Sequence, residues 1–418
     1  MSTEPTPTDA LGGRLARNLV LQSGTQIVAL AISVISAGIL ARALGVDGNG
    51  QFGYAFAYVF FLLTFADPGI STVVSRDLAA GGINPGVLQR VMGLRLTMAC
   101  LVMLAGWVVA FTLLDPVYRW PIVVFSLILP IQAASIGALV FTSRVMVRDS
   151  AVAEMANRLV GFALLLVAAS SGWGVTGVLG ALVVGELVGA IVTTWRTREW
   201  VRLVPRLDPG MWRQVVRGAA AVGGLGFLTA LVNRIDYFML ESMSSVTAVG
   251  LYEAAYRLPR LVEKVPLLVM ATVFPLMSRL AVDDVGRLRE VYHWSLLRLA
   301  GLAVVMLVVV QATAEWLLPL WQGEAFRPAV PALRWLIVSS ACMYLSVLAG
   351  NLLIAMHESR TLLGVWLVAT VVNVGLNWVW IPTYGPTGAA AATAVCFAVA
   401  AVLVLVLAER RLLVAGQR

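Results

Sequence analysis

Long stretches of apolar residues, separated by short polar segments, recur along almost the whole chain. A helix of roughly 20 apolar residues is long enough to cross a bilayer, and twelve stretches meet this length. They cover residues 18–43, 51–75, 90–113, 119–142, 151–171, 175–196, 214–240, 247–277, 292–315, 329–356, 361–381 and 386–409. The pattern predicts an all-α polytopic membrane protein with twelve transmembrane helices.

Composition supports this class and excludes several others. Of the 418 residues, 60% are hydrophobic and 12% are charged, whereas soluble domains have about 45–50% apolar and about 25% charged residues. A soluble globule could not cover so much apolar surface, and a disordered chain would be far more polar. Twelve spans leave only short loops, so that no soluble catalytic domain is expected.

The arginines indicate how the chain is oriented, because cytoplasmic loops collect basic residues. Twenty arginines fall in the termini and in alternate loops, and only Arg42, Arg119 and Arg327 fall on the other side. This predicts an inner-membrane protein with both termini in the cytoplasm. The charge of +8 is scattered between apolar runs, and nucleic acid is therefore not expected as a partner.

The two halves of the chain resemble each other. Gly50–Phe56 opens the second span and Gly250–Tyr256 opens the eighth; Gly174–Gly177 opens the sixth and Gly385–Gly388 the twelfth. Six spans return the chain to its starting side, so that the repeat is parallel, with a pseudo-two-fold axis along the membrane normal. We expect a disordered tail at 1–16, six-helix lobes at 17–197 and 214–409, a linker with a surface helix at 198–213, and a second tail at 410–418.

Charges within the C-terminal half point to a site. A charge at membrane depth is costly and usually faces a partner or a water-filled cavity. Glu253, Arg257, Arg260 and Lys264 share one face of a helix, which Pro259 and Pro266 should kink, and the seventh span adds Arg234 and Asp236. This cationic strip either binds an anionic headgroup or forms internal ion pairs.

The N-terminal half holds fewer charges. Asn18, Gln22 and Gln26 share one face of the first span and suit either a hydroxyl-rich ligand or helix packing. Glu154 and Arg158 are spaced to pair, Glu186 has no local partner, and Asp67-Pro68-Gly69 breaks the second span as a kink or a cavity acid. The three cysteines and two histidines are scattered, so that neither a metal site nor a cofactor is expected.

Several strings resemble the oligosaccharide and polysaccharide flippases of the multidrug/oligosaccharidyl-lipid/polysaccharide exporter superfamily. The resemblance runs from about residue 17 to 409. The strings are LARALG at 40–45, DPG at 67–69, RIDYFML at 234–240, VGLY at 249–252, FPLMSR at 274–279, LPLW at 318–321 and YGPTGAA at 384–390.

The resemblance implies two six-helix bundles around a central cavity and movement of lipid-linked oligosaccharides to the outer leaflet. The resemblance implies Arg234, Asp236, Arg257, Arg260 and Lys264 as candidate cavity residues, of which the four cations are the candidates for substrate binding. We add Asn18, Gln22 and Gln26 for the glycan, with Asp236, Glu253 and Glu186 as candidates for coupling to H+ or Na+. Membrane lipids, a polysaccharide polymerase and chain-length machinery are the expected partners of a monomer.

Three alternatives remain at this point. An ion-coupled multidrug or cation antiporter of the same superfamily would share the fold. A membrane glycosyltransferase or polymerase would need a large outer loop with acidic residues, whereas the outer loops here are short. A channel would need oligomeric pore-lining repeats, and the two-lobed repeat favours a monomer instead. The sequence thus predicts a transporter and not an enzyme.

Overall fold

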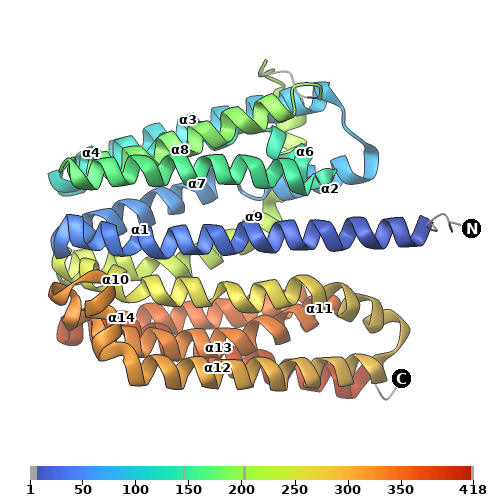
Figure 1. The fold of residues 1–418 in the computed structure, drawn as a ribbon. Helices are drawn as coiled ribbons and strands as arrows, with labels where there is room; N and C mark the ends of the chain where they lie inside the picture. The colour runs from blue at the N-terminus through green and yellow to red at the C-terminus, as the bar shows by residue number, and fades with distance from the viewer. Residues whose placement is uncertain (1–6, 145, 201–203, 416–418) are drawn as a thin grey trace, which may run out of the picture. The chain divides into compact units, whose positions relative to one another are not determined.

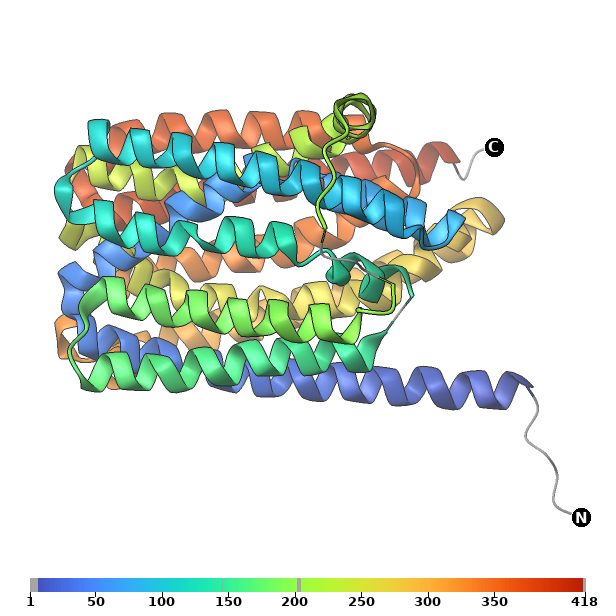
Figure 2. The same cartoon turned by 90° about the horizontal axis from the view of Figure 1, so that it is seen from above.

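The described part of the protein consists of helices and the segments that join them. The computed structural model describes residues 7–144, 146–200 and 204–415. Side chains are described from residue 24 onward, except at 145, 201–203, 220–222, 225 and 416–418. Figures 1 and 2 show long helices joined by short turns. In chain order they are α1 (Pro7–Ala66), α2 (Ile70–Gly81), α3 (Pro85–Leu113), α4 (Pro116–Ser126), α5 (Ile128–Ala134), α6 (Gly137–Ser143), α7 (Val147–Ser170), α8 (Gly174–Arg196), α9 (Pro209–Met243), α10 (Val246–Val262), α11 (Lys264–Asp283), α12 (Val285–Gln322), the 3₁₀ helix η1 (Glu324–Ala329), α13 (Val330–Ala355) and α14 (Ser359–Ala415).

Two helices each contain two of the predicted spans. α1 is interrupted at Gly45 (φ 65°) and α14 at Gly385 (φ 53°). Such positive φ angles suit glycine, which lacks a Cβ, and they mark the turns predicted at 43–51 and 381–386. Nine helices of the described residues are long and apolar enough to cross a membrane; with the two double spans and α9, they fit the twelve-helix layout.

Other spans are broken into shorter helices. α1 ends before Asp67-Pro68-Gly69, as predicted, and α4, α5 and α6 together form the fourth span. The kink predicted from Pro259 and Pro266 is confirmed: α10 ends at Val262 and α11 begins at Lys264. A proline lacks the N–H that continues the helical ladder, and the break follows from that loss.

The termini are more helical than we expected. α1 begins at Pro7 and α14 runs to Ala415, so that the expectation of disorder over 1–16 is wrong for residues 7–16, while residues 1–6 lie outside the described part. Proline fits the first turn of a helix, and the alanines, leucines and arginines that follow favour helical continuation of the span.

The chain divides into two compact units. Unit 1 comprises Met1–Ala43 and Ala55–Phe227, and unit 2 comprises Leu44–Tyr54 and Leu228–Arg418. The linker packs within unit 1, where Arg206 donates its backbone N–H to the carbonyl of Gln89 (3.0 Å) on α3. The boundary between the two units therefore lies within α9, between Phe227 and Leu228. The surface helix predicted at the linker is the first part of α9, which continues into the seventh span.

The turn within α1 belongs to unit 2 and crosses the beginning of α10. A Cβ on Gly50 would lie 2.1 Å from the carbonyl oxygen of Val246, and a Cβ on Gly250 would lie 2.0 Å from that of Val46. Each glycine thus meets the residue four positions before the other. This reciprocal contact is typical of a two-fold relation between segments, and it joins two of the strings that indicated the repeat.

Candidate functional site

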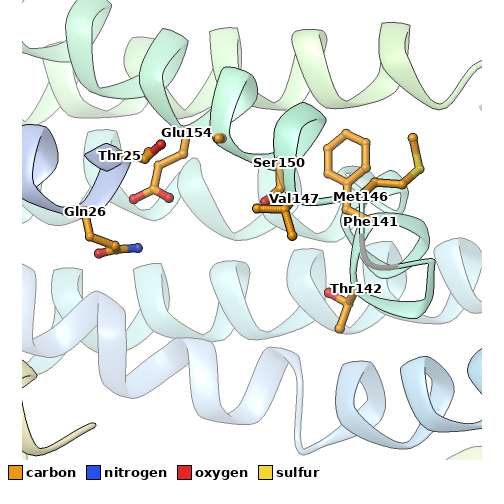
Figure 3. A pocket seen from close by; sticks show the side chains of 9 residues that line it. Thr25, Gln26, Phe141, Thr142, Met146, Val147, Ser150 and Glu154 are labelled. Carbon is orange, nitrogen blue, oxygen red and sulfur yellow. The ribbon is translucent and has the colours of Figure 1, made fainter. Parts of the chain in front are cut away.

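Neighbouring cavities within unit 1 bring polar side chains together. One cavity of about 370 Å³ lies between α1, α6 and α7 and is lined by Thr25, Gln26, Thr142, Ser150 and Glu154, among others. Figure 3 shows Thr25, Gln26 and Glu154 toward one end of this pocket and Phe141, Met146 and Thr142 toward the other. Of the predicted amide residues, Gln26 therefore lines a cavity, whereas the side chains of Asn18 and Gln22 lie outside the described residues.

Two further cavities share a lining residue with the first, and a third shares lining residues with one of these two. A cavity of about 420 Å³ shares Glu154 and extends to Glu186, and two more continue past Gln132 to Asp67. We call this set the unit 1 chamber. Its polar lining consists of Thr25, Gln26, Ser33, Ser36, Asp67, Ser71, Thr72, Ser75, Arg95, Gln132, Ser135, Thr142, Ser150, Glu154, Asn157, Arg158 and Glu186.

The middle of the chamber holds one ion pair and one carboxylate without a cation. Glu154 Oε1 lies 3.4 Å from Arg158 Nη2, as their spacing predicted, and Arg158 Nη1 donates to Ser33 Oγ (3.4 Å). Asn157 Nδ2 donates to Glu186 Oε2 (2.8 Å). Within the described part of the chain, no arginine or lysine forms an ion pair with Glu186.

Glycines on α8 explain why Glu186 meets Asn157. A Cβ on Gly185 would lie 2.8 Å from the Asn157 carbonyl oxygen, and a Cβ on Gly189 would lie 2.9 Å from Asn157 Cβ. Small residues four apart allow two membrane helices to approach closely, and α7 and α8 lie side by side in Figures 1 and 2. The close approach places the polar groups of both helices in one cavity.

The other end of the chamber holds the acid of the Asp67-Pro68-Gly69 break. Arg95 Nε lies 3.4 Å from Asp67 Oδ2, and Arg95 Nη2 donates to the carbonyl of Gln132 (3.1 Å). Asp67 also accepts from the backbone N–H of Ser71 (3.0 Å), which begins the turn into α2. The sequence left open whether Asp67 stabilises a kink or lines a cavity. It does both, since it caps the helix break and also lines a cavity.

The chamber offers many hydrogen-bond donors and acceptors but carries little net charge. Its ionisable residues are three acids and two arginines. Hydroxyls and amides donate to and accept from the hydroxyl groups of a sugar, and carboxylates accept from them. The excess carboxylate equally suits a small cation.

The cationic strip of unit 2 is paired internally. Arg257 Nε lies 3.7 Å from Glu253 Oε1, Arg260 Nη2 contacts Glu253 Oε2, and Tyr237 donates its hydroxyl to the same oxygen (2.7 Å). The side chains of Glu253 and Arg257 are 2% and 5% exposed. One buried carboxylate thus serves two arginines, which is the internal pairing that the sequence left open.

Arg257 has further partners that the sequence did not suggest. It donates to Gln322 Oε1 (3.0 Å) and contacts Asn49 Oδ1, while Gln322 in turn donates to the carbonyl of Ala254 (2.9 Å). Asn49 also donates to the carbonyl of Gly250 (2.7 Å). Burial and three neighbours, Glu253, Gln322 and Asn49, occupy the guanidinium of Arg257 in this structure, and its contact with an anionic headgroup stays a prediction.

The remaining strip residues lie in different surroundings. Arg260 is 28% exposed, and its guanidinium lies 5.1 Å from the ring centre of Tyr256. Lys264 is exposed at the first position of α11, beyond the helix break, and Arg234 is half-buried on α9. Their contact with an anionic substrate stays a prediction.

Asp236 occupies a neutral environment. It is 2% exposed and accepts from Tyr252 (2.5 Å), Thr393 (2.7 Å) and Asn377 (2.6 Å). Asn373 extends the cluster through a 3.1 Å hydrogen bond from Asn377. The described residues place no arginine or lysine against this carboxylate. Among the described residues, hydrogen-bond donors alone stabilise a charge on this carboxylate, and binding of a proton or a cation would lower the cost of its burial.

Several of these partners escaped sequence analysis because they come from distant segments. Asn49, Gln322 and Thr393 are single polar residues within or beside apolar runs. A polar residue within a span is a weak signal for such a role, and nothing in one sequence says which charge it accompanies.

The fold is similar to solved structures of transporters. An inward-facing multidrug resistance MATE family transporter of the MOP superfamily is 15% identical, with a TM-score of 0.71 over 94% of this chain and 96% of that one. An outward-facing MATE structure is 16% identical, with a TM-score of 0.65 over 96% of each. The lipid II flippase MurJ in an inward closed conformation is 10% identical, with a TM-score of 0.77 over 93% of this chain and 87% of that one.

Sequence comparison identifies the family. No curated protein sequence matches the chain significantly, but the model of the polysaccharide biosynthesis protein family matches residues 15–281. This range covers most of the chain and includes the unit 1 chamber, Asp236 and the paired strip. The chain is thus a multi-pass membrane protein that belongs to the polysaccharide biosynthesis protein family.

Proposed function

We propose that the protein moves a polyprenyl-pyrophosphate-linked oligosaccharide from the cytoplasmic to the outer leaflet of the inner membrane. The observation that carries this proposal is the unit 1 chamber, lined by sugar-compatible hydroxyl, amide and carboxylate groups, in a chain of this family. Flipping breaks no covalent bond, and neither a cofactor nor a catalytic residue is required.

The mechanism follows from alternating access. The glycan enters the chamber of unit 1 from the cytoplasm. Within unit 2, Arg234, Arg260 and Lys264 are the candidates for contact with the pyrophosphate. Guanidinium groups suit phosphate because they offer paired donors and stay charged. The protein works as a monomer with both termini in the cytoplasm, and it delivers its product to a polysaccharide polymerase and the chain-length machinery.

Loss of the protein tests this function. Cells that lack it are expected to accumulate the lipid-linked glycan on the cytoplasmic side of the membrane, and expression of the chain should reverse this. Unchanged lipid-linked glycan together with raised sensitivity to cationic drugs would favour the antiporter instead. The antiporter stays the second candidate function because Glu186, the carboxylate of the chamber without a paired cation, suits a cationic substrate.

Gln26 offers a direct test of glycan binding. Removing a hydrogen bond to a sugar costs about 0.5–1.5 kcal/mol, and Gln26→Leu is therefore expected to raise KM for the lipid-linked glycan about 2- to 12-fold with little change in kcat. Flipping rates at several substrate concentrations would measure this. Gln214→Leu, at an exposed position of α9, is the matched control, and an unchanged KM in Gln26→Leu would remove Gln26 from the site.

Asp236 is our candidate for coupling to H+ or Na+, ahead of Glu253, which two arginines already neutralise. Asp236→Asn keeps the size and most hydrogen bonds of the side chain but removes the charge. We expect flipping driven by an ion gradient to fall at least about tenfold, which corresponds to about 1.4 kcal/mol, while exchange without a gradient continues. Asp283→Asn, at a residue 56% exposed, should leave both activities intact; a gradient response that survives Asp236→Asn contradicts the assignment.

A further inference from the structure

A groove on unit 1 has no part in the function proposed above. It has a volume of about 630 Å³, and nearly all of its lining is apolar. Two helices supply this lining, α5 with Pro130, Ile131 and Ala134, and α8 with Leu187, Ala190 and Ile191. Leu187 and Ile191 are 43% and 58% exposed, so that the groove opens to the surroundings of the helices.

One end of the groove carries an aromatic ring close to two cations. The ring centre of Trp195 lies 5.2 Å from the guanidinium carbon of Arg196 and 5.5 Å from that of Arg198. Arg196 is paired with Asp149 (3.1 Å). Arg198 lines the groove itself, and among the described side chains no carboxylate pairs with it. A positive charge is therefore available where the apolar lining ends.

The dimensions of the groove match one leaflet. Residues 187–198 of α8 and its end span about 16 Å at 1.5 Å per residue, which is half of a hydrocarbon core of about 30 Å. Tryptophan and arginine at the end of a membrane helix are typical of the headgroup level. An aliphatic chain that follows the groove would hence bring its headgroup to Arg198.

We propose that this groove binds an anionic glycerophospholipid, with one acyl chain against α5 and α8 and its phosphate at Arg198. Arginine offers paired donors to phosphate and stays charged. A zwitterionic lipid has the same chain, but its ammonium group offsets the attraction. A polyprenyl chain is much longer than the groove, so that the substrate's own carrier is not the occupant.

The bound chain would lie directly behind the unit 1 chamber. α5 separates the two spaces, since Gln132 and Ala133 line the chamber while Ile131 and Ala134 line the groove. α8 also separates the two spaces, since Glu186 lines the chamber and Leu187 lines the groove. The lipid would thus complete the outer packing of the short helix α5. The binding itself does not depend on the flippase activity.

Photoactivatable lipids test the proposal. The full chain is placed in nanodiscs that contain a photoactivatable phosphatidylglycerol or phosphatidylcholine, and labelled peptides are mapped by mass spectrometry. We expect phosphatidylglycerol to label the α5 and α8 peptides about fivefold more than phosphatidylcholine, which is the preference that one arginine near the surface gives. Arg198→Gln should remove this preference, whereas Arg289→Gln, at an exposed arginine of α12, should keep it.

A second variant tests the groove itself. Ala190→Phe fills the groove and is expected to reduce labelling by both lipids several-fold; the Arg198→Gln comparison stands even if this variant fails to fold. Equal labelling by the two lipids, or a preference that survives Arg198→Gln, would overturn the proposal. Stronger labelling by a photoactivatable polyprenyl phosphate would assign the groove to the carrier lipid and overturn it as well.

Discussion

Joining residues 47 and 247 covalently is expected to stop flipping completely. Thr247 donates its hydroxyl to Asp47 (2.6 Å), and beside this contact Gly50 and Gly250 meet carbonyl oxygens of the opposite helix. The turn at 44–54 lies in unit 2, while the helix segments on either side of it belong to unit 1. Alternating access requires the predicted lobes 17–197 and 214–409 to move relative to each other. We expect the turn at 44–54 to part from α10 during that movement, and a bond between residues 47 and 247 would hold it in place.

The experiment uses Asp47→Cys with Thr247→Cys in a chain whose Cys100, Cys342 and Cys396 are replaced by alanine. Flipping is measured after oxidation, or after a short bifunctional thiol reagent, and again after reduction, which should restore it. Each single-cysteine variant controls for modification alone. Arg279→Cys with Asp283→Cys, within one turn of α11, controls for cross-linking that spans no moving contact. Full activity of the cross-linked 47–247 protein would contradict the mechanism.

Removing the carboxylate of Glu253 is expected to have the largest effect on stability. Its loss leaves Arg257 and Arg260 close together without their shared acid, and breaking a buried ion pair costs about 3–5 kcal/mol. Arg257→Met should cost less, about 1–3 kcal/mol, because Glu253 keeps Arg260 and only hydrogen-bond partners such as Gln322 lose their donor.

Unfolding in mixed micelles, followed by tryptophan fluorescence, measures both changes. Glu290→Gln, at an exposed position of α12, should alter the free energy of unfolding by less than about 0.5 kcal/mol. Equal destabilisation by Glu253→Gln and Arg257→Met, or less by Glu253→Gln, would contradict the assignment of Glu253 as the shared ion-pair partner of Arg257 and Arg260.

The sequence predicted the fold well because span length and helix breaks are local properties. Gly385, Pro266 and the Asp67-Pro68-Gly69 triplet each mark a break that the structure contains. The start of α1 was misjudged, because a polar composition at 1–16 says less about helix formation than continuity with the adjoining span does. The linker likewise continues into α9.

The site was predicted only in part. Helical spacing correctly placed Glu253, Arg257 and Arg260 on one face, but spacing cannot tell whether a face meets water or a partner. That outcome depends on Asn49 and Gln322, which lie far away in the sequence. The unit 1 chamber depends on packing as well: Glu186 joins it only because Gly185 and Gly189 let α8 approach α7.

Reconstitution of the purified protein in liposomes that contain a polyprenyl-pyrophosphate-linked oligosaccharide measures flipping itself. A membrane-impermeant glycosidase or lectin then reports how much of the glycan faces outward. We expect the protein to speed the appearance of the glycan in the opposite leaflet, Gln26→Leu to weaken this at low substrate concentration, and a cationic dye not to be transported. Unchanged glycan movement together with ion-driven export of the dye would contradict the proposed function.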